Sequence, residues 1–373
     1  MESYYDRLEE IKEAVSKYFT VEDVYYEAGL LTFLIREREI KEAFRRLYRE
    51  LKELGYIPSA RLSEGRVVIR VFRYREPTFS FLKYRNLPII LLAITLVVIL
   101  IDGYLWASFR SLYEVAFGPR SFLDKLFESG LYAAILLAIL GLHELAHLIA
   151  ARRAGTSASM PYFIPGIPGL IPTFGAVILQ KEPIVNRDEM FDLGLSGPLT
   201  SFILSTVIGF LAVSWYAPWL TERELMRVIE AVRASGGEVM TLQPPLVLQA
   251  IVALLQLGHP GRIPLMSGGV FFAIWLGFFV TALNLLPIWQ LDGSKIFRSV
   301  LSAKQHRIAS YVSLVILAAS GYFFIAILFF LLMSRTPDIP PLDEISPLSR
   351  SRKLLFFAAL AMIVLSYVLM IPL

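Results

Sequence analysis

Residues 136–155 read LLAILGLHELAHLIAARRAG, an apolar run that ends in the basic pair Arg152 and Arg153. A run of this length and composition is typical of a helix that crosses the hydrocarbon core of a bilayer. Within it, the spacing of His143 and His147 puts both imidazoles on one helix face, where they can reach a single cation. Glu144 lies about 100° further round the helix, close enough to bond a water beside the metal without being a ligand. The stretch therefore predicts a membrane-spanning helix that carries a metal site.

The whole chain has the composition of a membrane protein. It is 56% hydrophobic and only 18% charged, with a mean hydropathy of +0.59, whereas about a quarter of the residues in soluble domains are charged. The net charge is +4, but the basic residues lie among acids or beside apolar runs, where they favour lipid headgroups. We therefore expect membrane lipids as partners and no nucleic acid. The chain has no cysteine, so any metal must be bound by nitrogen and oxygen.

The polar residues are concentrated at the start of the chain. Nearly half of the charged residues lie within residues 1–87. Apolar residues at helical spacing predict amphipathic helices over 4–19 and 40–54, and β-branched and aromatic residues predict strands within 23–35 and 66–74. We expect a small soluble α+β domain over 1–87. It holds no cluster of His, Asp or Ser that would suggest catalysis, so we expect it to bind a regulator or a substrate instead.

The rest of the chain, residues 88–373, is a mainly α polytopic membrane region with its catalytic core at about 130–310. About six of its apolar runs approach the roughly 20 residues that span a bilayer. A further run, 245–258, is shorter and is expected to be interfacial or re-entrant. The expected spans are 88–108, 130–151, 191–217, 268–290, 308–333 and 353–371.

Basic residues suggest how these spans are oriented. Groups of Lys and Arg that begin at Arg70, Arg152 and Lys295 lie before the first expected span, at the end of the second and after the fourth. Cytoplasmic loops are enriched in such residues. The start of the chain is acidic and has neither the pattern of a signal peptide nor that of a transit peptide. We therefore expect a multi-pass protein of the cell membrane, rather than of a chloroplast membrane, with both termini in the cytoplasm.

One apolar segment, 159–179, cannot form a regular helix because it contains four prolines and three glycines. Backbone of this kind is tolerated at membrane depth only where protein or a hydrated cavity satisfies its amides. We expect a re-entrant irregular or β segment beside the site, with a short strand at 174–180. A loosely attached surface loop is the alternative.

A catalytic zinc takes three protein ligands and keeps one position open, so a third ligand must lie elsewhere. The metal motif lies about 13 Å along its helix from Arg152, and an unwound turn over 287–293 can bring Asp292 to that depth. We expect structural or interfacial roles for Asp102 and His259. The candidates in or beside apolar runs are Asp102, Asp192, His259 and Asp292.

These motifs together resemble the site-2 proteases, zinc metalloproteases that cleave peptide bonds within or near the membrane, in their archaeal and chloroplast branch. The resemblance covers about residues 130–310 and rests on HELAH at 143–147 and NLLPIWQLDG at 284–293. Between them, FGA at 174–176 and SGPL at 196–199 match further landmarks. Two features differ: loop 218–244 is too short for the PDZ domain that many relatives insert, and Ser294 stands where relatives often have a second glycine.

The resemblance implies one Zn²⁺ per chain, bound by His143, His147 and Asp292, with Glu144 as the catalytic base. It also implies that Asn284 contacts the substrate, a transmembrane helix of another protein that must unwind locally. The segment 159–180, with Phe174 and Gly175 at its strand edge, is expected to hold the unwound substrate. The turn from Asn284 to Pro287 is the alternative.

The expected function is therefore hydrolysis of peptide bonds in membrane-protein substrates, either to release regulators from the membrane or to remove membrane-embedded remnants such as signal peptides. A metal-ion or proton transporter is the main alternative, because intramembrane His and Asp clusters also mark ion pathways. A catalytically inactive scaffold is a third. The transporter is disfavoured because the sequence shows no internal repeat, and because Glu144 has no evident purpose in transport.

Overall fold

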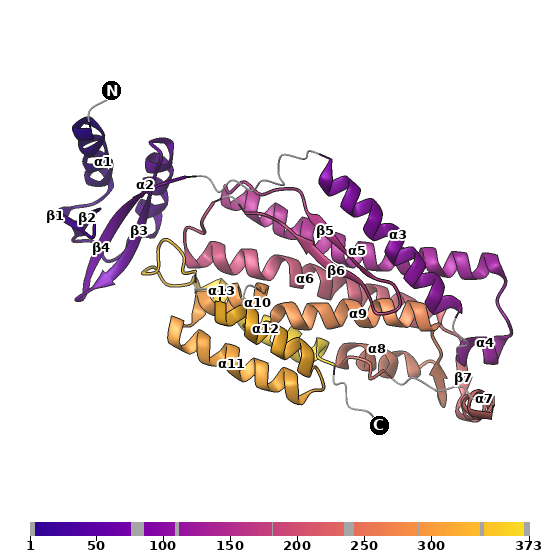
Figure 1. Cartoon of the computed structure of the whole chain (residues 1–373). Helices are drawn as coiled ribbons and strands as arrows, with labels where there is room; N and C mark the ends of the chain where they lie inside the picture. Colours follow the sequence, from indigo (N-terminus) through magenta and orange to yellow (C-terminus); the bar gives the residue numbers. More distant parts are fainter. Residues whose placement is uncertain are drawn as a thin grey trace.

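The computed structural model of the chain describes residues 4–75, 86–108, 112–180, 182–234, 242–288, 291–335 and 339–368. Helices make up most of these residues, and a small α+β unit at the N-terminus lies at one end of a bundle of long helices (Figure 1).

The N-terminal unit is a four-stranded antiparallel sheet with two helices. The strand order is β1-β2-β4-β3, and the two expected helices are α1 and α2. Their apolar sides pack against the sheet, so that Val15, Phe44, Leu47, Phe33 and Ile69 are fully buried. The elements are α1 (Tyr4–Tyr18), β1 (Val21–Glu27), β2 (Leu30–Ile35), α2 (Lys41–Glu53), β3 (Tyr56–Ser63) and β4 (Arg66–Arg73).

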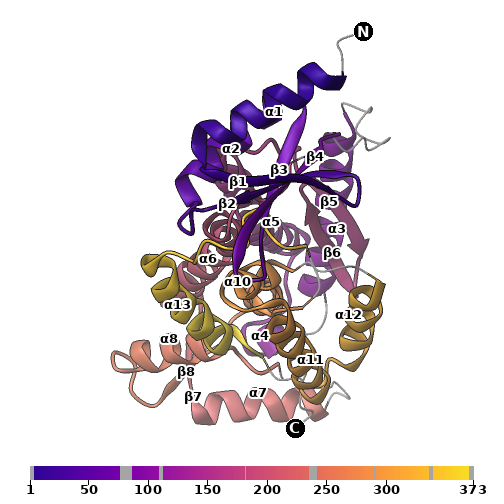
Figure 2. The same cartoon turned by 90° about the vertical axis from the view of Figure 1, so that its left-hand side faces the viewer.

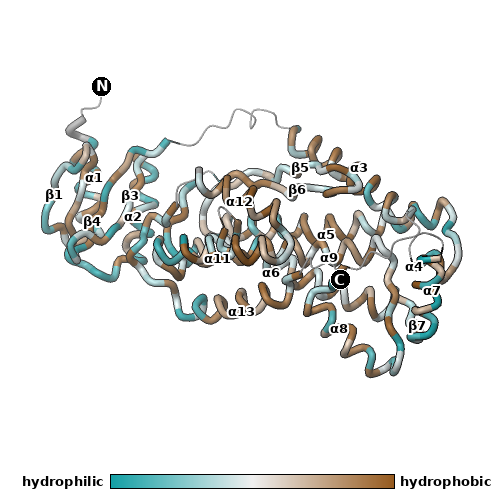
Figure 3. Tube along the Cα trace, turned by 60° about the horizontal axis from the view of Figure 1, so that its bottom comes forward, coloured by the Kyte–Doolittle hydropathy of each residue, from teal (hydrophilic) through white to brown (hydrophobic). Residues whose placement is uncertain are grey.

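Four helices in the described residues are long and apolar enough to cross a membrane. They are α3 (Leu87–Ser108), α5 (Phe122–Ala154), α6 (Arg187–Leu211) with the π-helical turn η2 (Ala212–Tyr216) that continues it, and α9 (Gly268–Leu285). Figure 3 shows that apolar residues dominate these helices, whereas the N-terminal unit is more polar. The helix α5, which carries the His-Glu motif, is longer than expected and begins with a capping box between Ser121 and Asp124.

The expectation of six spans is only partly met. The run 308–333 is not one span but two helices, α11 (Ala303–Ala319) and α12 (Phe323–Arg335). The chain turns between them at Gly321, whose φ of +95° suits a glycine. The last expected span begins as α13 (Arg350–Ser366), and its end at 369–371 lies outside the described residues. Residues 289 and 290 of the fourth expected span are outside them as well.

The proline-rich segment forms a β-hairpin. Its strands, β5 (Tyr162–Ile167) and β6 (Ile171–Val177), form an antiparallel pair of their own. The hairpin runs along α3 and α5 (Figure 1). The shorter elements that complete the fold are α4 (Leu112–Phe117), β7 (Trp219–Thr221), α7 (Glu222–Ala234), α8 (Leu246–Gln256), β8 (Arg262–Pro264) and α10 (Asp292–Val300).

A short extended segment, residues 342–344, joins the N-terminal unit to the helices. The amide of Ala60 on β3 donates to the carbonyl of Leu342 at 2.8 Å, and the amide of Leu342 donates to Ile184, just before α6, at 2.9 Å. In Figure 2, where the N-terminal unit faces the viewer, this unit lies across the ends of the helices. Three ion pairs reinforce the joint: Lys41–Asp188, Arg45–Glu189 and Lys52–Glu182.

Candidate metal centre

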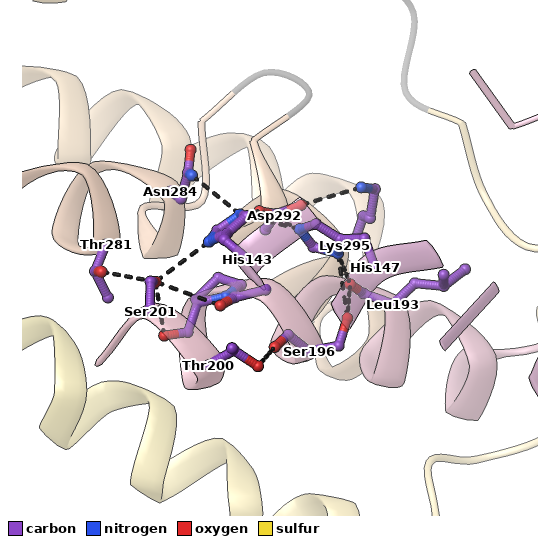
Figure 4. Close-up of polar contacts among 12 residues, drawn as sticks. His143, His147, Leu193, Ser196, Thr200, Ser201, Thr281, Asn284, Asp292 and Lys295 are labelled. Carbon is purple, nitrogen blue, oxygen red and sulfur yellow. Dashed lines mark hydrogen bonds and ion pairs between the residues drawn. The ribbon is translucent and has the colours of Figure 1, made fainter. Parts of the chain in front are cut away.

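His143 and His147 on α5 meet Asp292 at the first turn of α10 (Figure 4). Nε2 of His147 lies 3.1 Å from Nε2 of His143 and 3.0 Å from Oδ2 of Asp292. Nε2 of His143 lies 3.3 Å from the same Oδ2. His143 and Asp292 are 3% and 9% exposed, so three potential ligand atoms converge in a largely buried site.

Gly293 permits this convergence. A Cβ at Gly293 would lie 2.1 Å from the carbonyl oxygen of Leu285, at the end of α9. Only glycine therefore lets the start of α10 pack this closely against α9, which places the Asp292 carboxylate beside the two imidazoles.

Hydrogen bonds from α6 and α9 fix both imidazoles. Nδ1 of His147 lies 2.8 Å from the carbonyl oxygen of Leu193, which accepts its N–H and leaves Nε2 free for a metal. Nδ1 of His143 lies 3.2 Å from Oγ of Ser201, and Thr281 donates to that same Oγ at 2.8 Å (Figure 4). Both rings thus present Nε2 to the centre of the site.

The space between these atoms fits a metal ion. A Cβ added at Gly197 would lie 2.2 Å from Nε2 of His147 and 2.6 Å from Nε2 of His143. Only glycine at this position lets α6 approach the two Nε2 atoms so closely, so no side chain from residue 197 occupies the space beside them. Two imidazole nitrogens and one carboxylate oxygen also form a donor set that zinc commonly uses.

The other candidates for a third ligand are engaged elsewhere. Asp192 pairs with Arg352, with 2.7 Å between Oδ1 and Nε. The ring of His259 stacks on Trp219. Asp102 accepts hydrogen bonds from Tyr132 and from the β5–β6 turn. Within the described residues, Asp292 is the acid grouped with the two histidines.

Three polar side chains lie close to the three candidate ligands or next to them in the chain. Glu144 is partly buried and follows His143 on α5. Nδ2 of Asn284 lies 3.5 Å from Nε2 of His143. Nζ of Lys295 donates to Oδ1 of Asp292 at 3.2 Å.

The remaining expected site residues lie further out. Phe174 and Gly175 are on β6, where the Phe174 side chain is 58% exposed and Gly175 has a φ of +84°. Pro287 is buried, and its carbonyl accepts a hydrogen bond from Ser310 on α11. The structure thus groups Asn284 with the metal ligands and places Pro287 in the packing against α11.

Sequence reasoning assigned no role to Ser201, Thr281, Gly197 or Lys295. The landmark SGPL at 196–199 contains Gly197, so that glycine could have been found from the motif. Lys295 could have been found from its position one helical turn after Asp292. Ser201 and Thr281 carry no local signal, because hydroxyl residues are common in membrane helices.

Comparison with known proteins assigns the family. The model of Peptidase family M50 matches residues 131–328. The chain is 26% identical over 235 residues to the "Probable zinc metalloprotease EGY2, chloroplastic" of Oryza sativa subsp. indica, covering 60% of this chain and 39% of that protein.

It is also 29% identical over 242 residues to the "Probable zinc metalloprotease EGY1, chloroplastic" of Arabidopsis thaliana, covering 62% of this chain and 41% of that protein. The chain thus spans about two fifths of the length of these relatives. No solved structure is significantly similar. Because the family model covers more than half of the chain and includes the histidines and Asp292, the chain belongs to peptidase family M50, the site-2 protease family.

Proposed function

We propose that the chain is an intramembrane zinc metalloprotease that hydrolyses peptide bonds in the transmembrane segments of other membrane proteins. The observation that carries this proposal is the convergence of His143, His147 and Asp292, whose ligand atoms lie within 4.8 Å of one another, with Glu144 next to His143 on the same helix. In this proposal residues 88–373 are the protease domain, with a core at about 130–310, and residues 1–87 are a separate domain.

The protein residues divide the chemistry between them. His143, His147 and Asp292 would hold zinc, which supplies a Lewis acid for a water molecule and for the scissile carbonyl. Glu144 takes a proton from the attacking water and delivers it to the leaving nitrogen, as a general base and then a general acid. The amide of Asn284 lies on the same side as His143, where it can donate to the substrate.

A helical substrate must be extended before its peptide bonds can be reached. The hairpin offers a surface for this, because within the described residues β5 is the one strand that pairs with β6, and β5 is the strand that packs most extensively against α3. The outer edge of β6, with Phe174 and Gly175, can therefore add an extended substrate as a further strand. The exposed side chain of Phe174 would contact the substrate there.

The N-terminal domain is proposed to bind a regulator or the soluble part of a substrate. Its edge strand β1 is exposed along nearly its whole length, and such an edge can accept another strand. Its joint to α6 places it at the end of the helices.

We propose a cell-membrane location with both termini in the cytoplasm, supported by the basic flanks of the apolar runs. Because the chain has no cysteine, single cysteines can be introduced at the exposed positions Ser16 and Ala234 and probed from outside with an impermeant thiol reagent. Labelling at Ala234 alone is expected. Labelling at Ser16 would contradict this orientation.

The function is tested with the purified chain in proteoliposomes. Co-reconstitution with single-span membrane proteins should give fragments cut within the span, detected by mass spectrometry, and a zinc chelator should stop their formation. The same vesicles should show no zinc or proton flux above that of empty vesicles. Flux without fragments would support the transporter instead.

A further inference from the structure

Asp102 is a carboxylate buried between the long helices. It lies on α3 and is 1% exposed. The hydroxyl of Tyr132 on α5 donates to its Oδ2 at 2.5 Å, and the amide of Gly169, in the turn between β5 and β6, donates to its Oδ1 at 2.7 Å. Because burying an acid among apolar helices is unfavourable unless it is hydrogen-bonded, the two donors explain how Asp102 is accommodated. They also make it a link between two helices and the tip of the hairpin.

The helices on which Asp102 lies are tightly packed at this level. A Cβ at Gly103 would lie 2.8 Å from Cδ1 of Tyr132, and Oγ of Ser129 donates to the carbonyl of Leu100 at 2.6 Å. The tightly packed helices α3 and α5 therefore form a rigid base. The Asp102 carboxylate attaches the tip of the hairpin to this base.

The other end of the hairpin is fixed separately. The amide of Ser159 donates to the carbonyl of Leu179 at 3.0 Å, and the amide of Leu179 donates to Oγ of Ser159 at 3.0 Å. Between the two ends, the pairing is irregular at Phe163–Pro165, so the base alone does not hold the strands in one register along α5.

The position of the tip sets which part of β6 lies at the level of the metal ligands. Tyr132 precedes His143 by eleven residues, about 16 Å along a helix. Gly169 precedes Phe174 by five residues, the first two of which, Gly169 and Leu170, lie in the turn before β6, so the two residues are at most about 17 Å apart along the hairpin. Both paths start at Asp102 and run in the same direction, towards the base of the hairpin. Phe174 and Gly175 are therefore at the level of His143.

We propose that Asp102 is a positioning residue, which holds the tip of the β5–β6 hairpin so that the edge of β6 presents one particular peptide bond of the substrate to the metal centre. The inference rests on the proposed protease function and on substrate capture by β6. The new element is that the tip of the hairpin, which Asp102 holds, determines which peptide bond of the substrate is cut. A slip by two residues, which keeps each side chain on its face, would move the substrate by about 7 Å.

The test compares cut positions and kinetics in Asp102→Ala, Asp102→Asn and wild type, using the full chain and one single-span substrate. Alanine removes both acceptors, so the cut should spread to neighbouring bonds and KM should rise about five-fold, as for the loss of one hydrogen bond, with the zinc content unchanged. Asparagine keeps an acceptor for the Gly169 amide and should restore the single cut. Tyr132→Phe, which leaves the Gly169 bond intact, is the matched control and should also cut at one bond.

A single wild-type cut with unchanged KM in Asp102→Ala would overturn the proposal. Should Asp102→Ala lose zinc, Asp102→Ser is tested in the same way. Loss of zinc in both variants would also overturn it, because the carboxylate would then be holding the helices together rather than the hairpin.

A second measurement does not depend on proteolysis. Spin labels on cysteines placed at the exposed positions Leu170 and Leu142 report the distance between the hairpin tip and α5. The distribution should be narrow with Asp102 or Asp102→Asn and broad with Asp102→Ala. Equal widths would show that Asp102 does not hold the hairpin tip, even if the enzyme is active. A distribution broadened by Asp102→Ala in a protein that shows no proteolysis would support the role of Asp102 and count against the proposed function alone.

Discussion

Lys295 donates a hydrogen bond to one oxygen of Asp292, while the other oxygen of that carboxylate faces the two imidazoles. Lys295 lies one turn after Asp292 on α10, so the helix itself sets this geometry. The ammonium orients the carboxylate so that only Oδ2 is directed at the metal position. Such outer partners tune metal affinity in many metalloproteins.

Replacing Lys295 by methionine should therefore weaken zinc binding. The loss expected for an outer partner is about 10- to 100-fold in affinity, because the Asp292 carboxylate would be free to turn. Competition with a chromophoric chelator measures the affinity. Lys304→Met, at an exposed position on α11, is the control and should bind zinc as wild type does. Equal affinities for the two variants would show that Lys295 does not position Asp292.

Gly197→Ala should abolish zinc binding while the chain still folds. The added Cβ would lie within 2.6 Å of both Nε2 atoms, so the two imidazoles would have to move apart and could no longer bind one ion together. Elemental analysis of the purified variant gives the zinc content. The control is Gly141→Ala on α5, where a Cβ would meet nothing within 4 Å. One equivalent of zinc in Gly197→Ala would place the metal elsewhere.

Glu344→Ala should lower the melting temperature of the chain and loosen the N-terminal unit. Glu344 pairs with Arg61 on β3 and with Arg298 on α10, and Arg298 is only 3% exposed. A buried charge that loses the carboxylate paired with it is destabilised, even where a hydrogen bond to a backbone carbonyl, such as that from Arg298 to Leu301, remains. Thermal unfolding of the detergent-solubilised protein and limited proteolysis after β4 measure the two effects.

The exposed pair Lys12–Glu9 provides the control for this measurement, since such surface pairs contribute little. Lys12→Ala should leave the melting temperature nearly unchanged. A melting temperature for Glu344→Ala equal to that of Lys12→Ala would mean that the ion pairs at Glu344 do not hold the joint.

Local spacing accounts for the parts of the site that the sequence predicted. His143 and His147 face one ion because a helix repeats every 3.6 residues, and Asp292 could be inferred because few acids lie near apolar runs. The hydrogen bonds of Ser201 and Thr281 could not be predicted, since they depend on how α6 and α9 pack against α5.

The fold was predicted less completely where composition does not reveal a turn. The run 308–333 is apolar throughout, and the single glycine at 321 gave no clear sign that it ends one helix and precedes another. The segment 159–179 was easier, because its prolines exclude a helix. The pairing of its strands and the contact with Asp102 required the tertiary structure.

In the proposed reaction the three metal-binding residues and Glu144 have separate roles: the former hold zinc, and Glu144 transfers the proton. Asp292→Asn should lose both zinc and activity, because it weakens a ligand.

The most direct test is therefore to measure zinc content and substrate cleavage together in purified Glu144→Gln. Glutamine keeps the size of the side chain but cannot act as a base, so the account predicts about one zinc per chain and a rate reduced by about 10²- to 10⁴-fold or more. Cleavage near the wild-type rate with zinc still bound would contradict it.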